Sequence, residues 1–174
     1  MGVITPEMDA GRRALLRDPN WEEPVADDSP WRSRKVHLGR RDRFWTDSGD
    51  TYVHLLPVYD PRDYDVFDVI AWEPQRPGRW WWQSGLAVLL GEDDLRSIQL
   101  AERRAIRLVE NPAAWLDAKA PAVCILDWYG CDLRRVLRDV GTIRCSTLRL
   151  AEFLERRLAE QVAHRFDIRV ARGR

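Results

Sequence analysis

Apolar and polar residues alternate along the first half of the chain in a way that is typical of β-strands. Two short runs, at 52–56 and 66–72, are rich in β-branched and aromatic residues and are bounded by turn-forming residues. Successive side chains of a strand point to opposite faces, so such runs suit strands that border a core. We expect these two runs to pair as antiparallel neighbours, with further strand-like alternation beginning near Val36.

In residues 101–174, apolar runs alternate with helical patterns. The run at 122–126 is continuous, which is typical of a strand buried on both faces. Asn111 followed by Pro112 predicts a capped helix start, and Ser146 is expected to cap a long helix. The predicted strands are 105–109, 122–126, 142–145 and 166–170, and the predicted helices are 112–118, 132–140 and 146–165.

This pattern predicts an α/β (or α+β) protein, with an N-terminal β-rich portion followed by a small βαβ-type, mostly parallel sheet. We expect residues 1–31 to form an N-terminal helix and arm, 32–100 a β-rich, tryptophan-containing portion, and 101–174 a small α/β portion. A chain of 174 residues is long enough to bury a single core. The three parts are therefore expected to form one compact domain.

Three consecutive tryptophans, Trp80, Trp81 and Trp82, follow Arg79, in a chain with nine tryptophans in all. Three adjacent side chains cannot all point the same way, so we expect at least one ring at the surface, with Trp81 as an exposed anchor. Tryptophan and arginine are enriched at the energetic centres of protein interfaces. We therefore predict that Arg79 and the three tryptophans bind a protein partner.

Two segments resemble parts of proteins from alphaproteobacterial prophages and related mobile elements. The first runs from Asp68 to Trp81 and continues at 85–91, and the second spans 107–116. Neither segment is a catalytic motif, and the resemblance implies a phage-like setting without an assigned activity or site. It favours a non-catalytic accessory protein that binds a protein partner of such an element, and it leaves homo-oligomers open.

Nucleic-acid binding is the alternative. Basic residues gather at 32–43 beside Trp31, Phe44 and Trp45, and such groups grip phosphates while aromatic rings stack on bases. The predicted interface is Arg32, Arg34, Lys35, Arg40, Arg41, Arg43 and Trp45. The segments 132–140 and 146–165 could also form a helix-turn-helix, although the intervening 142–145 fits a strand better.

Catalytic patterns are weak. The acidic residues at 60–68 could bind Mg²⁺, and Asp68 with Glu73 loosely resembles a nuclease pair, but Gln75 stands where such a site needs lysine. A metal-dependent nuclease is therefore a remote alternative. The three cysteines and His164 match no closed zinc pattern. Asp127 is the strand-end candidate, because α/β sheets place ligands at the carboxyl ends of parallel strands.

Composition narrows these classes further. The net charge is zero, and no apolar run reaches the roughly 18 residues that span a bilayer. The N-terminus carries no basic segment followed by an apolar stretch, and three cysteines without a CxxC spacing are typical of reduced thiols. We expect a cytoplasmic protein without a membrane partner, a metal or a cofactor, and not an enzyme.

Overall fold

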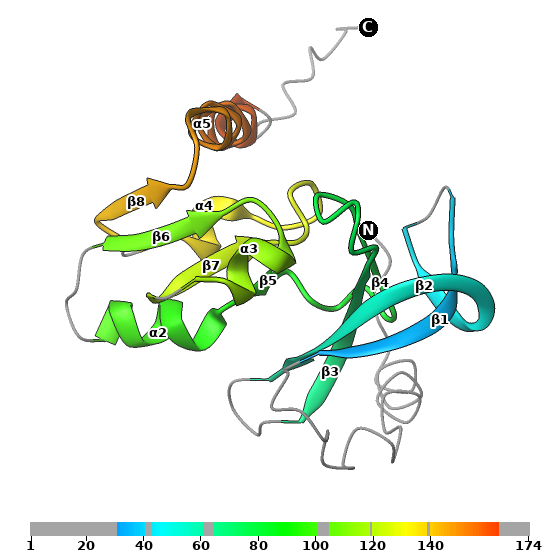
Figure 1. Cartoon of the computed structure of the whole chain (residues 1–174). Helices are drawn as coiled ribbons and strands as arrows, with labels where there is room; N and C mark the ends of the chain where they lie inside the picture. Colours follow the sequence, from blue (N-terminus) through cyan, green and yellow to red (C-terminus); the bar gives the residue numbers. More distant parts are fainter. Residues whose placement is uncertain are drawn as a thin grey trace, which may run out of the picture.

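The computed structural model is a mixed α/β fold of two four-stranded sheets, with the described helices grouped around the second sheet (Figure 1). An antiparallel sheet comes first and a sheet with parallel strands second, which confirms the predicted fold class. The structure describes residues 31–40, 43–60, 65–100, 105–118, 120–138 and 140–163. The predicted N-terminal helix and arm, and the predicted strand at 166–170, lie outside these residues.

The first sheet has the strand order β1-β2-β3-β4 and is antiparallel throughout. Its strands are β1 (Arg32–Leu38), β2 (Trp45–Tyr59), β3 (Val66–Trp72) and β4 (Trp80–Trp82). The predicted strand pair is confirmed, since His54 lies opposite Trp72. β2 is longer than expected because it continues past a β-bulge, where the pairing with β1 jumps from Thr51 to Thr46 and leaves residues 47–50 without a partner in that register.

The first sheet is strongly curled, so that the start of β2 approaches the edge strand β4. A Cβ on Gly49 would lie 2.3 Å from the backbone nitrogen of His37, so a residue without a side chain is needed at this crossing. At the other edge, Phe44 bridges Trp82, and the Trp82 N–H donates to the Arg43 carbonyl at 3.0 Å. Arg43 takes a left-handed conformation with φ of 58°, which is uncommon for a residue other than glycine.

The second sheet is mixed, with the strand order β5-β7-β6-β8. Its strands are β5 (Leu89–Leu90), β6 (Ala105–Val109), β7 (Ala122–Ile125) and β8 (Thr142–Cys145). β6 runs parallel to both β7 and β8, whereas β5 is antiparallel to β7. The predicted alternation of strands and helices therefore gives parallel pairs, as expected, and the segment 84–91 supplies the antiparallel strand.

The described helices are α2 (Glu92–Leu100), α3 (Pro112–Leu116), α4 (Leu133–Val136) and α5 (Leu148–Ala163). The Asn111 side chain caps α3 as predicted, whereas α5 is capped by Thr147 and not by Ser146. α4 is shorter than the predicted 132–140, because the chain must turn back to start β8 beside β6. β8 separates α4 from α5, so the helix-turn-helix interpretation is wrong.

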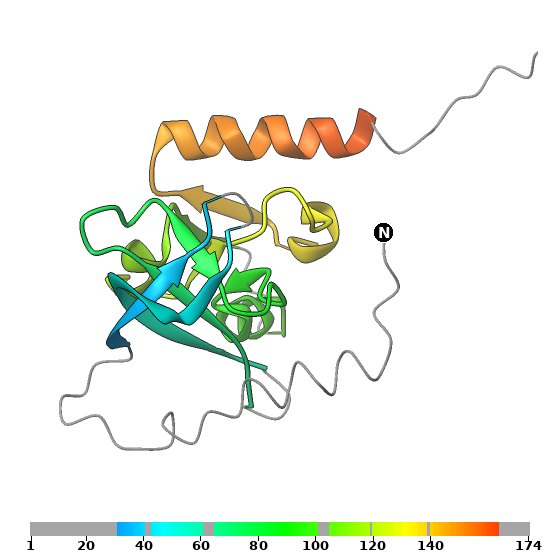
Figure 2. The same cartoon turned by 90° about the vertical axis from the view of Figure 1, so that its right-hand side faces the viewer.

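Apolar side chains form two clusters, one on each face of the first sheet. The main cluster fills the space between the two sheets and includes Ile70, Trp72, Leu108, Val123 and Leu126. The inner cluster lies within the curl of the first sheet and consists of Val36, Trp45, Val53, Leu55, Val69, Ala71 and Trp81. Figure 2 shows α5 along one side of the molecule, beyond β8 and α4, where Leu150 and Leu154 join the main cluster.

Asp68 is fully buried in β3, with 0% of its surface exposed. Its carboxylate accepts five backbone hydrogen bonds of 2.8–3.2 Å, three at Oδ1 and two at Oδ2. The donors are the N–H groups of Val69, Gln83, Ser84, Leu86 and Ala87. A buried charge is tolerated where hydrogen bonds replace its lost hydration. Because four donors lie in 83–87, Asp68 holds the segment that connects the two sheets.

We expect Asp68→Asn to lower the free energy of unfolding by about 3 kcal/mol, because an amide nitrogen replaces one accepting oxygen and leaves buried N–H groups without an acceptor. Urea unfolding followed by tryptophan fluorescence measures this loss. Asp50→Asn changes an exposed carboxylate on β2 and should stay within about 0.5 kcal/mol of the parent. Equal effects of the two substitutions would contradict the role given to Asp68.

Candidate functional site

The three consecutive tryptophans lie in the protein interior. Trp80 is 5% exposed and Trp81 3%, while Trp82 is half-buried. Alternation along β4 places Trp81 in the inner cluster and the other two rings against the main cluster. The expectation that Trp81 is an exposed anchor is wrong, because apolar side chains cover both faces of the first sheet and leave neither face of β4 to solvent.

Each of the three indoles donates its Nε1–H to a backbone carbonyl. Trp81 donates to Gly39 at 2.8 Å, Trp82 donates to Ala87 at 2.9 Å, and Trp80 donates to Leu126 at 3.3 Å. The bond from Trp82 reaches the segment 83–87 that connects the two sheets, and the bond from Trp80 reaches the residue that follows β7. The triplet therefore links the first sheet to the rest of the fold, which is a structural role.

Two arginines cover these rings. The guanidinium carbon of Arg43 lies 5.1 Å from the ring centroid of Trp80 and 5.2 Å from that of Trp82, and that of Arg79 lies 4.9 Å from Trp81. These distances suit cation–π attraction. Burial lowers the pKa of Arg43, the charge of Arg79 lowers it further, and Asp127 opposes both. The fold thus brings together Arg43, Arg79 and Asp127, which the sequence had placed in three separate candidate sites.

The basic residues at 32–43 do not form one continuous strip. Arg34 is exposed and forms an ion pair with Asp47 at 3.2 Å. Lys35 and Arg40 are exposed, Arg32 is half-buried, and Arg41 lies outside the described residues. Arg43 is engaged by the tryptophans, so Lys35 and Arg40 remain as the exposed cations of this set that an anionic ligand would meet.

Trp45 cannot stack on a nucleic-acid base, as the predicted nucleic-acid interface would require. It is 3% exposed within the inner cluster, and its Nε1–H donates to the Val69 carbonyl at 2.9 Å. The alternation that fills the curl of the first sheet turns this ring inward. Phe44, one residue earlier, is 40% exposed and lies at the bridge to β4.

A different aromatic group lies at the outer end of the first sheet. Ser33, His54, Trp72 and Trp80 are successive neighbours across the four strands. The His54 ring centroid is 5.6 Å from that of Trp72, 5.9 Å from Trp31 and 6.1 Å from Tyr52. His54 therefore links the buried rings of the main cluster to the surface ring of Tyr52, which is 52% exposed.

Lys35 lies directly opposite Tyr52 in the β1–β2 register and is exposed. Trp31, Lys35, Tyr52 and His54 together form what we call the β1–β2 surface. Burial lowers the pKa of His54, whose Nδ1 lies 3.0 Å from the Ser33 hydroxyl, so this ring is neutral near pH 7. Sequence reasoning treated Tyr52 and His54 as strand residues, and the missing signal was the cross-strand register.

Asp127 follows β7, where a strand-end ligand was expected. Its Oδ1 accepts hydrogen bonds from the N–H groups of Tyr129, at 3.1 Å, and Gly130, at 2.7 Å. A Cβ on Gly130 would lie 2.1 Å from Asp127 Oδ2, so a side chain at this position would displace the Asp127 carboxylate. The contacts of Asp127 are those of a residue that closes its own turn.

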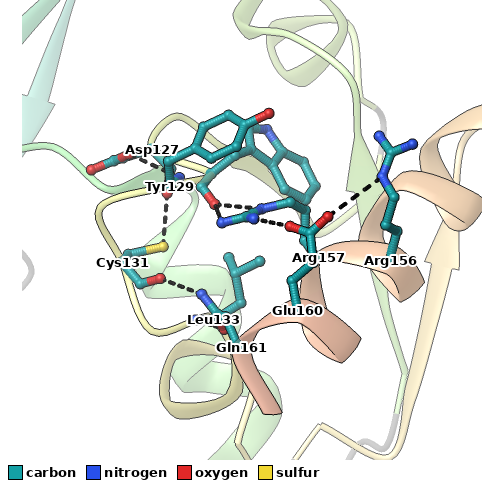
Figure 3. Close-up of polar contacts among 9 residues, drawn as sticks. Asp127, Tyr129, Cys131, Leu133, Arg156, Arg157, Glu160 and Gln161 are labelled. Atoms are coloured by element: carbon teal, nitrogen blue, oxygen red, sulfur yellow. Dashed lines mark hydrogen bonds and ion pairs between the residues drawn. The ribbon is translucent and has the colours of Figure 1, made fainter. Parts of the chain in front are cut away.

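α5 holds the same turn from its other side (Figure 3). Arg157 donates from Nε and Nη2 to the Trp128 carbonyl, at 3.1 and 2.9 Å, and it also pairs with Glu160. Its guanidinium carbon lies 4.3 Å from the ring centroid of Tyr129. Gln161 completes the link, donating to the Cys131 carbonyl at 2.7 Å and accepting from the Leu133 N–H at 3.0 Å.

The acidic and thiol groups of the described residues do not form a metal-binding cluster. Both oxygens of Asp68 are used by backbone donors, Glu73 lies 4.0 Å from Arg76, and Asp63 lies outside the described residues. Within the described part of the chain, no three histidine, cysteine, aspartate or glutamate residues could hold a metal ion. Burial, with the Asp127 charge, raises the pKa of the Cys131 thiol to about 11, which does not favour a nucleophilic thiolate.

The chain matches no protein-family model, no curated protein and no solved structure. The resemblance to prophage and mobile-element proteins therefore stays a prediction. None of the described helices is both long enough and apolar enough to span a lipid bilayer.

We expect Trp81→Ala to lower the free energy of unfolding by about 3–5 kcal/mol, because it opens a cavity in the inner cluster. It also leaves the Gly39 carbonyl without its indole donor. Thermal and urea unfolding measure the loss, with Tyr59→Ala, which removes a ring that is 50% exposed on β2, as the control. A stable Trp81→Ala protein would return this ring to a binding role.

Proposed function

We propose that the protein binds single-stranded nucleic acid through the β1–β2 surface. The observation that carries the proposal is the exposed Tyr52 ring beside exposed Lys35, with His54 and Trp31 packed behind it. Aromatic rings stack on unpaired bases, and a neighbouring cation meets the adjoining phosphate. The edge-to-face contacts of His54 support the Tyr52 ring and favour a preorganised platform.

Single strands fit this surface better than duplexes. A stacking ring needs an unpaired base, whereas a duplex presents phosphates and groove edges. The surface offers one exposed cation, Lys35, because Arg34 pairs with Asp47 and Arg43 lies on the tryptophans. We infer modest affinity with a limited electrostatic share, in a chain whose net charge is zero.

Binding to a protein partner of a phage-like element was the first prediction from the sequence. Its proposed anchors now have structural roles: Trp80 and Trp81 are buried, and Arg79 lies over Trp81. The hypothesis of a non-catalytic accessory protein is compatible with either ligand. Protein binding therefore becomes the interpretation to pursue if the nucleic-acid tests below fail.

We expect Tyr52→Ala to weaken binding of a labelled single strand of about 15 nucleotides by about 1–3 kcal/mol, the range for loss of one stacking ring. Fluorescence anisotropy at low salt measures the affinity. Tyr59→Ala removes an equally exposed tyrosine from the same strand and should leave it unchanged. If the two variants bind equally, or if no strand binds the parent, the proposal fails.

Salt dependence tests the cation separately. One phosphate contact, at Lys35, would weaken binding roughly 2.5-fold between about 50 and 200 mM salt. Lys35→Ala should reduce the slope of log K against log salt by about 0.7, since one contact is lost. Arg96→Ala, at an exposed position on α2, is the charge-matched control. An unchanged slope for Lys35→Ala would remove this residue from the interface.

A further inference from the structure

A pocket of about 430 Å³ opens on the second sheet, beside β6 and β8. This volume lies within the range of small-molecule sites. The lining includes the strand residues Ala105, Arg107 and Arg144, the residues Ala120 and Pro121 that precede β7, and Ser146, which follows β8. None of these residues belongs to the β1–β2 surface.

The strand register explains why there is a hollow. Arg107 lies between Ala122 on β7 and Arg144 on β8, so the three side chains share one face of the sheet. Ala105, two residues before Arg107, lies on the same face. Alanine side chains beside two long arginines leave a depression with a small apolar floor and cationic walls.

The charge arrangement is unusual for a surface without a ligand. Two like charges directly opposite each other on neighbouring strands repel and destabilise the pair. Some described arginines are engaged by other groups, as Arg34 is by Asp47 and Arg157 is by Glu160 and the Trp128 carbonyl. The side chains of Arg107 and Arg144 have neither a hydrogen bond nor an ion pair with any other described residue.

We propose that this pocket binds a phosphate monoester, with the phosphate held between Arg107 and Arg144. Guanidinium groups bind phosphate oxygens through paired hydrogen bonds, and two of them match a dianion better than a single carboxylate. The pocket is larger than a phosphate ion, so the remaining space would receive an organic body over Ala105, Ala120 and Pro121. Ser146 also lines the pocket and would supply a hydroxyl donor, while its backbone N–H, which donates to the Leu108 carbonyl at 2.9 Å, fixes its position after β8.

This site does not depend on the proposed binding of single strands, because it uses other residues on the other sheet. A phosphate monoester could belong to a free small molecule or to the 5′ end of a nucleic-acid strand. The two sources share the same phosphate chemistry. They are distinguished by comparing adenosine monophosphate with a short strand that carries or lacks a 5′ phosphate.

Backbone amide NMR on the 20.4 kDa protein tests the proposal. Inorganic phosphate and adenosine monophosphate should shift the signals of residues 105–107 and 144–146, while adenosine without phosphate should not. Acetate, a monoanion, should bind at least about tenfold more weakly than phosphate. Absence of phosphate-dependent shifts, or shifts confined to other regions, would overturn the proposal. If the 5′-phosphorylated strand shifts these signals and adenosine monophosphate does not, a strand end is the ligand.

Arg107→Gln and Arg144→Gln should each weaken phosphate binding by at least about tenfold, since each removes a charged hydrogen-bonding partner. Arg134→Gln, at an exposed arginine on α4, is the matched control and should bind like the parent. The amide spectra show directly whether each variant is folded. If folded Arg107→Gln and Arg144→Gln bind phosphate with wild-type affinity, the site is rejected. If either variant does not fold, the phosphate titration of the parent protein decides whether the site exists.

Discussion

The buried carboxylate of Asp68 is the interaction on which the arrangement of the two sheets depends. It lies in β3 and accepts N–H groups from the connector at 83–87, so the chain leaves the first sheet along one path. Just after this segment, the Val88 carbonyl accepts hydrogen bonds from the N–H groups of Leu126 and Asp127, which directly follow β7. The Asp127 turn is in turn held by Arg157 of α5 through the Trp128 carbonyl. One anchored carboxylate thus begins a series of contacts that ends at the last described helix.

The tryptophans connect different segments of the chain through indole hydrogen bonds. Five indoles, those of Trp45, Trp80, Trp81, Trp82 and Trp115, donate to backbone carbonyls in other segments. Each ring therefore buries a large apolar area while its N–H group is satisfied, which is the condition for burying tryptophan. The many tryptophans of this chain consequently serve to join the two sheets and the curled edge of the first sheet. Their number is therefore weak evidence for a binding surface.

The two proposed sites use opposite physical strategies. The β1–β2 surface is aromatic with one cation, so stacking would supply most of its binding energy and specificity for sequence would be low. The pocket on the second sheet has two cations over a small apolar floor, so charge and hydrogen bonding would dominate there. Loss of one site should leave the other intact, because Lys35 and Tyr52 lie on β1 and β2 whereas Arg107 and Arg144 lie on β6 and β8.

Local pattern was sufficient to predict several elements. β3 and β6 have the bounds expected at 66–72 and 105–109, and Asn111 caps α3 as its sequence indicated, because periodicity and capping act within a few residues. The site residues depended on long-range pairing instead. The inner cluster decided which face of β4 holds Trp81. The strand register decided that Tyr52 lies opposite Lys35 and that Arg107 lies opposite Arg144. A one-residue change of register would reverse every such side chain, and no local pattern records that choice.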